Sequence, residues 1–400
     1  MIGLLLGTEE DWPAAFEALV ARLGPVDGHT LRTERILNEP FDLRSVPRFG
    51  LVIDRLAWWY DLPRAWLKKI SLMDDVYLLN NPFTFQAMEK HSAYCAMMRL
   101  GIRVPDTWLI PHKVPPANPR FEPTAERYNA AFELERIGGE VGYPLFMKPF
   151  DGGQWIGVSR VGSAEELRRQ YDESGERMMH LQGAVEDFDV FVRSLSIGAE
   201  TMSMWFDPSR PMHDRYQVRH DFLSTELGDE IVTISRLVNA FFRWEFNSCE
   251  TIVKHGVAYP IDYANASPDV AVTSLHYYFP WVIMALVRWS AFCICTRREM
   301  RINQNSRDYF DIGDDPELDY GSKLARYREL ADDYFQVDSY RSFCERHLGH
   351  LDEVAHEWFT SPEFDQVLVS TVRSTFPTHE HEHFVDHYRG LLAAWARDTA

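Results

Sequence analysis

The sequence has few cysteines and fewer basic than acidic residues. Its five cysteines are scattered through 400 residues, and the opening MIGLLLG is too short, and too poor in basic residues, for a secretory signal. We therefore expect a reducing, cytoplasmic environment and a buried first strand. With 41 Lys and Arg against 60 Asp and Glu, the formal charge is -19. Such a charge disfavours nucleic acid and anionic membrane surfaces as partners.

A long uninterrupted hydrophobic run is also missing. The most apolar stretch, residues 277–296, contains Pro280 and Arg288 and is bracketed by His276 and Arg297. Its uninterrupted part is shorter than the roughly 20 residues that a membrane span needs. We expect a buried helix or a subunit contact here, the latter in a possible homodimer, and no membrane partner.

The common phosphate-binding motifs are absent as well. No segment fits G-x-x-x-x-G-K-[ST], no G-x-G-x-x-G follows a strand, and no H-R-D or D-F-G set of a protein kinase occurs. Because the chain is acidic, a phosphate site must be of another kind and must use a local cluster of cations.

The chain does contain enough apolar residues for large cores, at 46% hydrophobic and 14% aromatic. Residues 1–80 alternate short apolar runs with helical patterns, as in an α/β layer. Strands dominate residues 143–269, interrupted by helices at 163–174 and 229–242, and the chain is helical after 270. The sequence therefore predicts an α/β (α+β) protein of three parts, at 1–80, 81–270 and 271–400.

Two acids and an amide surround a predicted hairpin. Glu250 and Asp262 flank Gly256, and Asn265 follows three residues later. Carboxylate and amide oxygens suit a nucleotide-bound magnesium ion. Acids also flank hairpins for solubility alone, and Glu245 and Asn247 compete for the role of Glu250, which has the better spacing.

Two lysines add cations to this pattern. Lys148 ends an apolar strand and precedes a glycine-rich loop whose backbone amides are able to approach phosphate oxygens. Lys90 begins a helical segment that ends near Gly101. Either lysine, taken alone, also fits a solvated surface position.

Taken in order, these motifs resemble the ATP-grasp superfamily, whose members include carboxylate–amine and carboxylate–thiol ligases. The resemblance spans residues 75–270 and rests on Lys90 with GIRVP, YPLFMKP with DGG, LQGAVEDFD, and the acids around Gly256. It implies two lobes that clasp ATP around a hinge near 182–186. It also implies a Rossmann-like domain before them, with a helical region after them.

The resemblance assigns roles by position. It implies that Lys90 and Lys148 bind the phosphates, that a flap including Asp151, Gly152 and Gly153 covers them, and that Asp189 binds the ribose. The implied adenine-binding hinge is Gln182, Gly183, Ala184 and Val185, and the implied magnesium ligands are Glu250, Asp262 and Asn265.

The sequence also departs from the family pattern. The usual second-strand motif is acid-x-Asn, whereas Asp262 and Asn265 are separated by two residues, so we expect a β-bulge to restore the geometry. The arginine that usually follows is missing. Arg193, Arg215 and Arg219 become the candidates for stabilising a transferred phosphoryl group, although strand arginines often only pair with nearby acids.

The implied reaction uses ATP and Mg²⁺ to convert a small-molecule or peptide acid to an acyl phosphate, which an amine or similar nucleophile then attacks. The alternatives are a protein that binds nucleotide without ligating and a small-molecule kinase. Cys249, beside Glu250, fits a buried thiol better than a nucleophile.

A zinc hydrolase is a more remote alternative. HEHEH at residues 379–383 satisfies H-E-x-x-H, with Glu380 as the base and His387 continuing the row. Adventitious metal binding and a solvated helix start explain the same residues.

Overall fold

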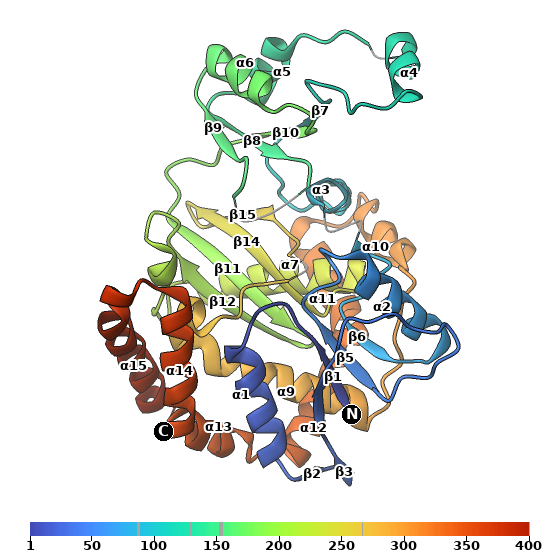
Figure 1. The fold of residues 1–400 in the computed structure, drawn as a ribbon. Coiled ribbons are helices and arrows are strands. Elements are labelled where there is room, and N and C mark those ends of the chain that lie inside the picture. Colours follow the sequence, from blue (N-terminus) through green and yellow to red (C-terminus); the bar gives the residue numbers. More distant parts are fainter. Residues whose placement is uncertain (86–88, 129, 152–154, 266, 400) are drawn as a thin grey trace.

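The computed structural model describes residues 1–85, 89–128, 130–151, 155–265 and 267–399. They form a large body, which contains both ends of the described chain, and a smaller lobe that projects from it (Figure 1). The body and the lobe are built around different sheets.

The first part of the chain forms a parallel sheet in the order β4-β1-β5-β6. Its strands are β1 (Ile2–Leu5), β4 (Thr33–Arg35), β5 (Leu51–Asp54) and β6 (Tyr77–Leu79), with helices α1 (Asp11–Arg22) and α2 (Asp61–Met73) and a small hairpin of β2 (Pro25–Val26) and β3 (His29–Thr30). All residues of β1, β5 and β6 are buried, as expected for continuous apolar runs in a parallel sheet. The predicted α/β pattern and buried first strand are confirmed.

The lobe contains an antiparallel sheet in the order β7-β10-β8-β9. Its elements are β7 (Thr107–Ile110), α4 (Phe121–Tyr128), α5 (Leu134–Val141), β8 (Leu145–Pro149), β9 (Ser159–Val161), α6 (Ala164–Glu173) and β10 (Met179–Gly183). Leu145, Leu167 and Leu181 belong to a hydrophobic core that is separate from that of the body. Lys148 and His180 are cross-strand partners, so both side chains lie on the same face of this sheet.

The large sheet is antiparallel, in the order β13-β12-β11-β14-β15. Its strands are β11 (Val190–Ile197), β12 (Glu200–Phe206), β13 (Tyr216–Gln217), β14 (Phe246–Lys254) and β15 (Val257–Asp262), with the 3-10 helix η2 (Met212–Asp214) and helix α7 (Thr225–Phe242). Ile231 of α7 packs with Val192 and Val253 on one face. The predicted hairpin is present, and its turn places His255 and Gly256 at positive φ. The lobe stands over the β14–β15 edge (Figure 1).

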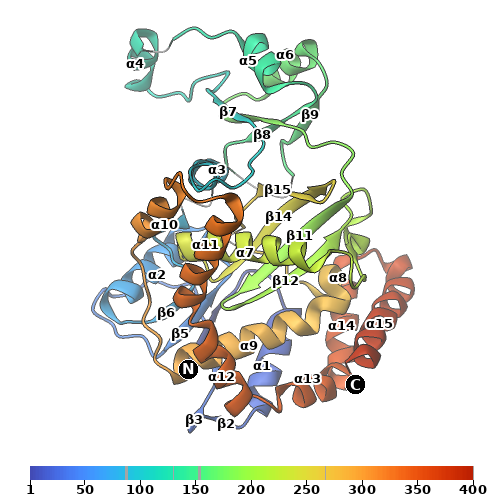
Figure 2. The same ribbon diagram turned by 180° about the vertical axis from the view of Figure 1, so that it is seen from behind.

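Helices form the remainder of the body. They are α8 (Val272–Leu275), η3 (His276–Tyr278), α9 (Phe279–Cys295), α10 (Ser306–Gly313), α11 (Tyr320–Phe335), α12 (Val337–His347), α13 (Leu351–Phe359), α14 (Pro362–Thr375), η4 (Thr378–Glu380) and α15 (His381–Asp398). Figure 2 shows α9 running beneath the large sheet and α11 lying against α7. Within the described residues, Val272–Cys295 is long and apolar enough to cross a membrane, but 78% of that window is buried inside the protein. The prediction of a buried helix is confirmed.

One hydrophobic core joins the two ends of the chain. It includes Leu51 of the parallel sheet, Phe279 of α9 and Tyr388 of α15. The C-terminal helices therefore pack into the same core as the N-terminal sheet. The boundaries at residues 80 and 270 remain predictions.

Candidate functional site

Charged side chains from several elements meet between the lobe and the edge of the large sheet. Lys90 begins helix α3 (Lys90–Arg99), Lys148 lies on β8, and Arg193, Glu250 and Asp262 lie on β11, β14 and β15. Lys90 and Lys148 are only 9% and 8% exposed. The structure thus brings together two lysines and two acids that are far apart in the sequence, and it adds one of the three candidate arginines.

The β14–β15 ladder places Glu250 and Asp262 directly opposite each other. The next pair is Thr251 with Pro260, so Ile261 has no partner and the register shifts at this point. This irregularity lies before Asp262, not between Asp262 and Asn265 where we expected it. It brings both carboxylates into one cross-strand pair.

The two carboxylates differ in their electrostatic surroundings. Burial raises the pKa of Glu250 and the charge of Asp262 adds to the effect, although Arg193 Nη2 lies 3.3 Å from Glu250 Oε1 and opposes it. Burial also acts to raise the pKa of Asp262. There it is outweighed by Lys90, whose Nζ lies 2.6 Å from Oδ2, and the net shift of the pKa is downward. Two carboxylates therefore lie close together in a half-buried place, and the charged form of one of them is disfavoured.

The chemistry of this pair fits a divalent cation. Asp262 Oδ1 is buried and has no hydrogen-bond partner among the described residues. Oxygen ligands of this kind are those that Mg²⁺ prefers. The described part of the chain holds no group of three or more His, Cys, Asp or Glu side chains able to bind a metal. An ion at this pair would therefore need further ligands besides His, Cys, Asp and Glu side chains, such as an amide oxygen, a bound substrate or water.

Asn265 is engaged in the turn after β15. Its side-chain oxygen accepts a hydrogen bond from the amide of Ser267 at 3.2 Å, and its own amide donates to Asn247 Oδ1 at 2.7 Å. Asn247 Nδ2 in turn donates to the carbonyl of Tyr263 at 2.8 Å. Asn247 thus holds the backbone of this turn, and the role of Asn265 as a metal ligand remains a prediction.

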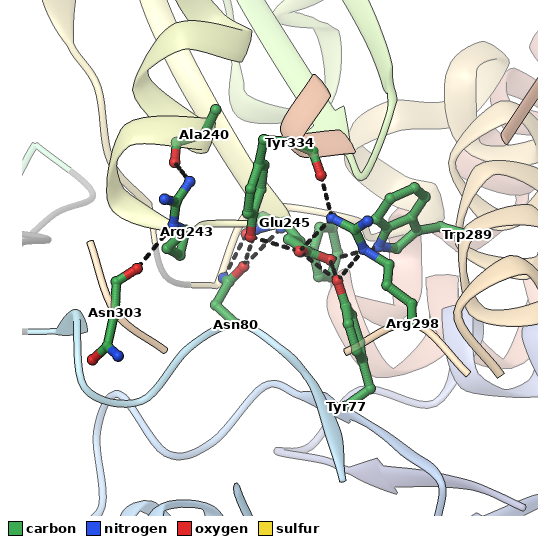
Figure 3. Close-up of polar contacts among 10 residues, drawn as sticks. Tyr77, Asn80, Ala240, Arg243, Glu245, Trp289, Arg298, Asn303 and Tyr334 are labelled. Atoms are coloured by element: carbon green, nitrogen blue, oxygen red, sulfur yellow. Dashed lines mark hydrogen bonds and ion pairs between the residues drawn. The ribbon is translucent and has the colours of Figure 1, made fainter. Parts of the chain in front are cut away.

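Glu245, the acid that competed for the role of Glu250, lies directly before β14 among protein donors. Tyr77 Oη donates to both of its oxygens, at 2.5 and 2.6 Å, while Tyr334 Oη and Trp289 Nε1 donate at 2.8 Å each. Arg298 adds a positive charge, with Nη2 at 3.8 Å from Oε1 (Figure 3). Glu245 is 2% exposed and is saturated by these contacts, so it is a structural residue.

The side chain of Lys148 extends from β8 toward the neighbouring strand β10. Its Nζ donates to Gln182 Oε1 at 2.7 Å, and Gln182 Nε2 donates to Thr107 Oγ1 at 2.9 Å. Burial lowers the pKa of Lys148 to about 8. A cation held in such a place is stabilised by an anionic ligand, because that ligand offsets the desolvation.

Two histidines beside Lys148 were not predicted. His91 Nδ1 lies 3.3 Å from His180 Nε2, and the rings are stacked with centroids 5.5 Å apart. Burial, followed by the effect of His91, lowers the pKa of His180 to about 3. The sequence signal was the alternation of His180 and Gln182 on one strand, which places both on the face of Lys148.

The predicted hinge begins at Gln182, which contacts Lys148, and one residue of the predicted flap lies within the described part of the chain. Gly183 and Ala184 donate backbone hydrogen bonds to the carbonyls of Asp106 and Pro144, at 2.9 and 3.2 Å, and Val185 packs against the core of the body. Asp151 is exposed directly after β8, whereas the predicted Gly152 and Gly153 lie outside the described residues.

Asp189 is exposed near the tip of the β14–β15 hairpin. Its Oδ2 accepts a hydrogen bond from the amide of His255 at 2.6 Å. The carboxylate therefore helps to fix the hairpin turn, and its predicted contact with a ribose is an additional role that no described contact tests.

Of the three predicted arginines, the structure brings Arg193 to the acids. Arg215 Nε donates to the carbonyl of Arg210 at 3.1 Å, in the loop after β12. The guanidinium of Arg219 lies 4.3 Å from the centroid of the Trp205 ring. Trp205 pairs with Val192 on the face covered by α7, and Arg193 lies on the opposite face because side chains alternate along a strand.

The HEHEH segment does not form the helical zinc motif. Helix α15 begins at His381, so His379 lies in η4 and not on one helical face with His383. His379 Nε2 lies 3.8 Å from Glu380 Oε1, and His381 Nε2 lies 2.9 Å from the carbonyl of Phe376. These contacts, together with the lack of a metal-binding group in the described residues, give the zinc alternative no support.

Solved structures identify the fold. No family model matches the chain, and no curated protein matches it either. The RimK domain protein ATP-grasp from Sphaerobacter thermophilus matches with a TM-score of 0.50 and 14% identity, over 72% of this chain and 98% of its own. The D-alanine–D-alanine ligase from Bacillus anthracis complexed with ATP matches with a TM-score of 0.50 and 13% identity, over 74% and 98%. The chain has the ATP-grasp fold, as its sequence motifs predicted.

Proposed function

We propose that this protein is a ligase that uses Mg-ATP to activate a carboxylate as an acyl phosphate and joins it to an amine or a similar nucleophile. The observation that supports this best is the convergence of Lys90, Lys148, Glu250 and Asp262 between two sheets of an ATP-grasp fold. Cations for phosphate and oxygens for a metal ion lie in one buried place there, which is what a nucleotide–metal complex requires.

Each group has a distinct part in the proposal. Lys90 and Lys148 hold the phosphates, with Asp151, Gly152 and Gly153 covering them, and Glu250 and Asp262 hold the ion, with Asn265 beside them. The adenine lies along Gln182, Gly183, Ala184 and Val185, and the ribose near Asp189. These positions rest on the resemblance and on the geometry of the lysines and acids.

Arg193 is the group we propose to stabilise the transferred phosphoryl. It reaches Glu250 from β11, and its guanidinium lies 5.2 Å from the centroid of the Phe206 ring, so its direction is fixed by packing. A bound magnesium ion would supply further neutralisation of phosphate charge. The residues of the chain then position the two reactants and exclude water, which supplies much of the rate in such transfers.

The proposed substrates are small molecules or peptides, and the proposed location is the reducing cytoplasm. All five cysteines are free thiols, and three of them are buried. This fits a compartment in which thiols stay reduced. A homodimer remains a prediction.

The central experiment is a screen of candidate acids and amines for ADP release, with mass spectrometry of the product. A ligase releases ADP only with both substrates, a small-molecule kinase yields a stable phosphorylated product without an amine, and a nucleotide-binding protein releases no ADP. We expect the first result.

Two variants connect that result to the site. Lys148→Ala and Asp262→Ala should abolish magnesium-dependent ATP binding or turnover while the circular dichroism spectrum stays native. Lys113→Ala is the matched control, because Lys113 lies in the same lobe but is exposed and paired with Asp172 at 2.5 Å. Unchanged ATP affinity in both site variants would contradict the proposal.

A further inference from the structure

A cavity of about 780 Å³ adjoins the proposed phosphate site. It lies where five segments meet, namely those after β5, after β6, at the start of α3, after β8 and before α10. Its lining includes Trp58, Phe83, Phe150, Glu89 and Asp151. The volume is typical of a small-molecule site. The backbone amide of Lys90 donates to the carbonyl of Phe150 at 3.3 Å, so this wall is continuous with the phosphate lysine.

Hydrogen bonds from the body fix the walls of the cavity. Trp244 Nε1 donates to Thr84 Oγ1 at 3.1 Å, and Asn81 Nδ2 donates to the carbonyl of Ile302 at 3.1 Å. Arg243 Nε donates to the carbonyl of Asn303 at 3.2 Å (Figure 3). The cavity is thus formed before a ligand arrives, which lowers the entropy cost of binding.

Glu89 is the polar group in this lining whose contacts are incomplete. It is 9% exposed, and its Oε1 caps α3 by accepting the amide of Ser92 at 3.1 Å. Its Oε2 is buried and has no hydrogen-bond partner among the described residues. A buried carboxylate oxygen without a donor is unfavourable, and a donor supplied by a ligand would remove that penalty.

The lining has a negative charge and aromatic faces. Asp151 provides a second carboxylate, and the described residues that line the cavity include no lysine or arginine. The nearby cations already have contacts, and Lys68 makes its contact with a ring of the lining. Lys90 pairs with Asp262, and Lys68 Nζ lies 5.6 Å from the centroid of the Phe83 ring. Carboxylates combined with aromatic faces are the usual recognition elements for an ammonium group.

We infer that this cavity binds the amine substrate through its ammonium group, with Glu89 as the principal charge partner and Trp58, Phe83 and Phe150 around an apolar flank. The inference rests on the proposed ligase function and assigns a binding site to its amine substrate. It assigns the acid substrate to the opposite side of the phosphate site, because a carboxylate is repelled by Glu89 and Asp151.

Benzylamine and benzyl alcohol are matched probes, since they share size and shape and differ in charge at neutral pH. Their affinities are measured by ligand-observed NMR titration of the full chain. We expect Glu89→Gln to lower the affinity for benzylamine at least tenfold, because the charge partner of the ammonium group is lost. The affinity for benzyl alcohol should stay unchanged, because glutamine retains an oxygen that accepts the hydrogen bond of the Ser92 amide. Glu140→Gln, an exposed change in the lobe and away from the cavity lining, is the control and should bind both probes as the wild type does.

Asp151→Asn provides a second test that does not depend on the stability of Glu89→Gln, because the side chain is exposed. We expect this variant to lower the affinity for benzylamine about threefold. Equal binding of the two probes by the wild type, or equal benzylamine affinity in the wild type and both variants, would overturn the inference. Mg-ATP affinity is measured in the same samples. A wild type that binds benzylamine selectively but not Mg-ATP would refute the proposed function and leave the cation site established.

Discussion

Strand β14 and the residue just before it carry two glutamates with opposite surroundings. Glu245, just before the strand, accepts hydrogen bonds from two tyrosines and a tryptophan and lies near Arg298. Glu250, five residues later, faces a second carboxylate, and burial raises its pKa. The protein supplies every partner that Glu245 needs, whereas Asp262 Oδ1, in the pair of Glu250 and Asp262, has no hydrogen-bond partner among the described residues. A saturated acid stabilises the fold, and an unsaturated pair is a place for a ligand.

The largest expected effect on stability is at Glu245. Glu245→Gln places an amide against tyrosine and tryptophan donors and leaves Arg298 without its carboxylate, so we expect the free energy of unfolding to fall by about 3–5 kcal/mol. Urea denaturation followed by circular dichroism measures this change. A loss below about 1 kcal/mol would remove the distinction between the two glutamates.

The matched substitution in the middle of the strand should affect function instead. Because burial already disfavours the charged form of Glu250, we expect Glu250→Gln to change the free energy of unfolding by less than about 1 kcal/mol. Turnover of Mg-ATP should fall by about 10²–10³-fold, as for the loss of a preorganised electrostatic group. Steady-state ADP release reports the second effect. Strong destabilisation with near-normal turnover would reverse our comparison.

The pKa of Lys148 gives a smaller effect that depends on pH. With a pKa of about 8 in the free protein, Lys148 is protonated at pH 7 and largely neutral at pH 9. Phosphate favours the protonated form, so Mg-ATP affinity should decrease as pH rises through 8, by about tenfold between pH 7 and 9. Lys148→Arg keeps its charge throughout and should flatten the profile. Identical profiles for the wild type and this variant would contradict the assignment.

The smallest effect is expected at Arg219. Its guanidinium stacks on Trp205, on the face of the sheet away from the acids, so Arg219→Ala should change ADP release by less than about twofold. Arg193→Ala, on the face of the acids, should reduce ADP release at least about a hundredfold. Equal losses of ADP release in the two variants would show that the side of the sheet on which an arginine lies does not determine whether it acts in the reaction.

The sequence predicted those parts of the site that depend on local order. The acids on either side of Gly256 and the lysine before a glycine-rich loop are properties of short segments, so spacing made them candidates and the resemblance to the ATP-grasp superfamily assigned their roles. The stacking of His91 on His180 was missed because it requires the packing of α3 against β10. Arg219 lies beyond the end of β13, so alternation along a strand could not assign its face.

Glu245 shows the same limit at longer range. Its partners Tyr77, Trp289 and Tyr334 come from β6, α9 and α11, and no short segment contains two of them. Spacing rightly favoured Glu250 for the hairpin pair, but it could not show that Glu245 holds three parts of the body together.

The shared core of the body restricts how this protein can change over evolutionary time. Because residues near both ends of the chain fill one interior with α9 at its centre, a substitution in the terminal helices must be compensated in the first sheet. The lobe, with a core of its own, escapes that restriction. Diversification among descendants of this chain is therefore expected to concentrate in residues 107–183, while the body changes slowly and as a whole.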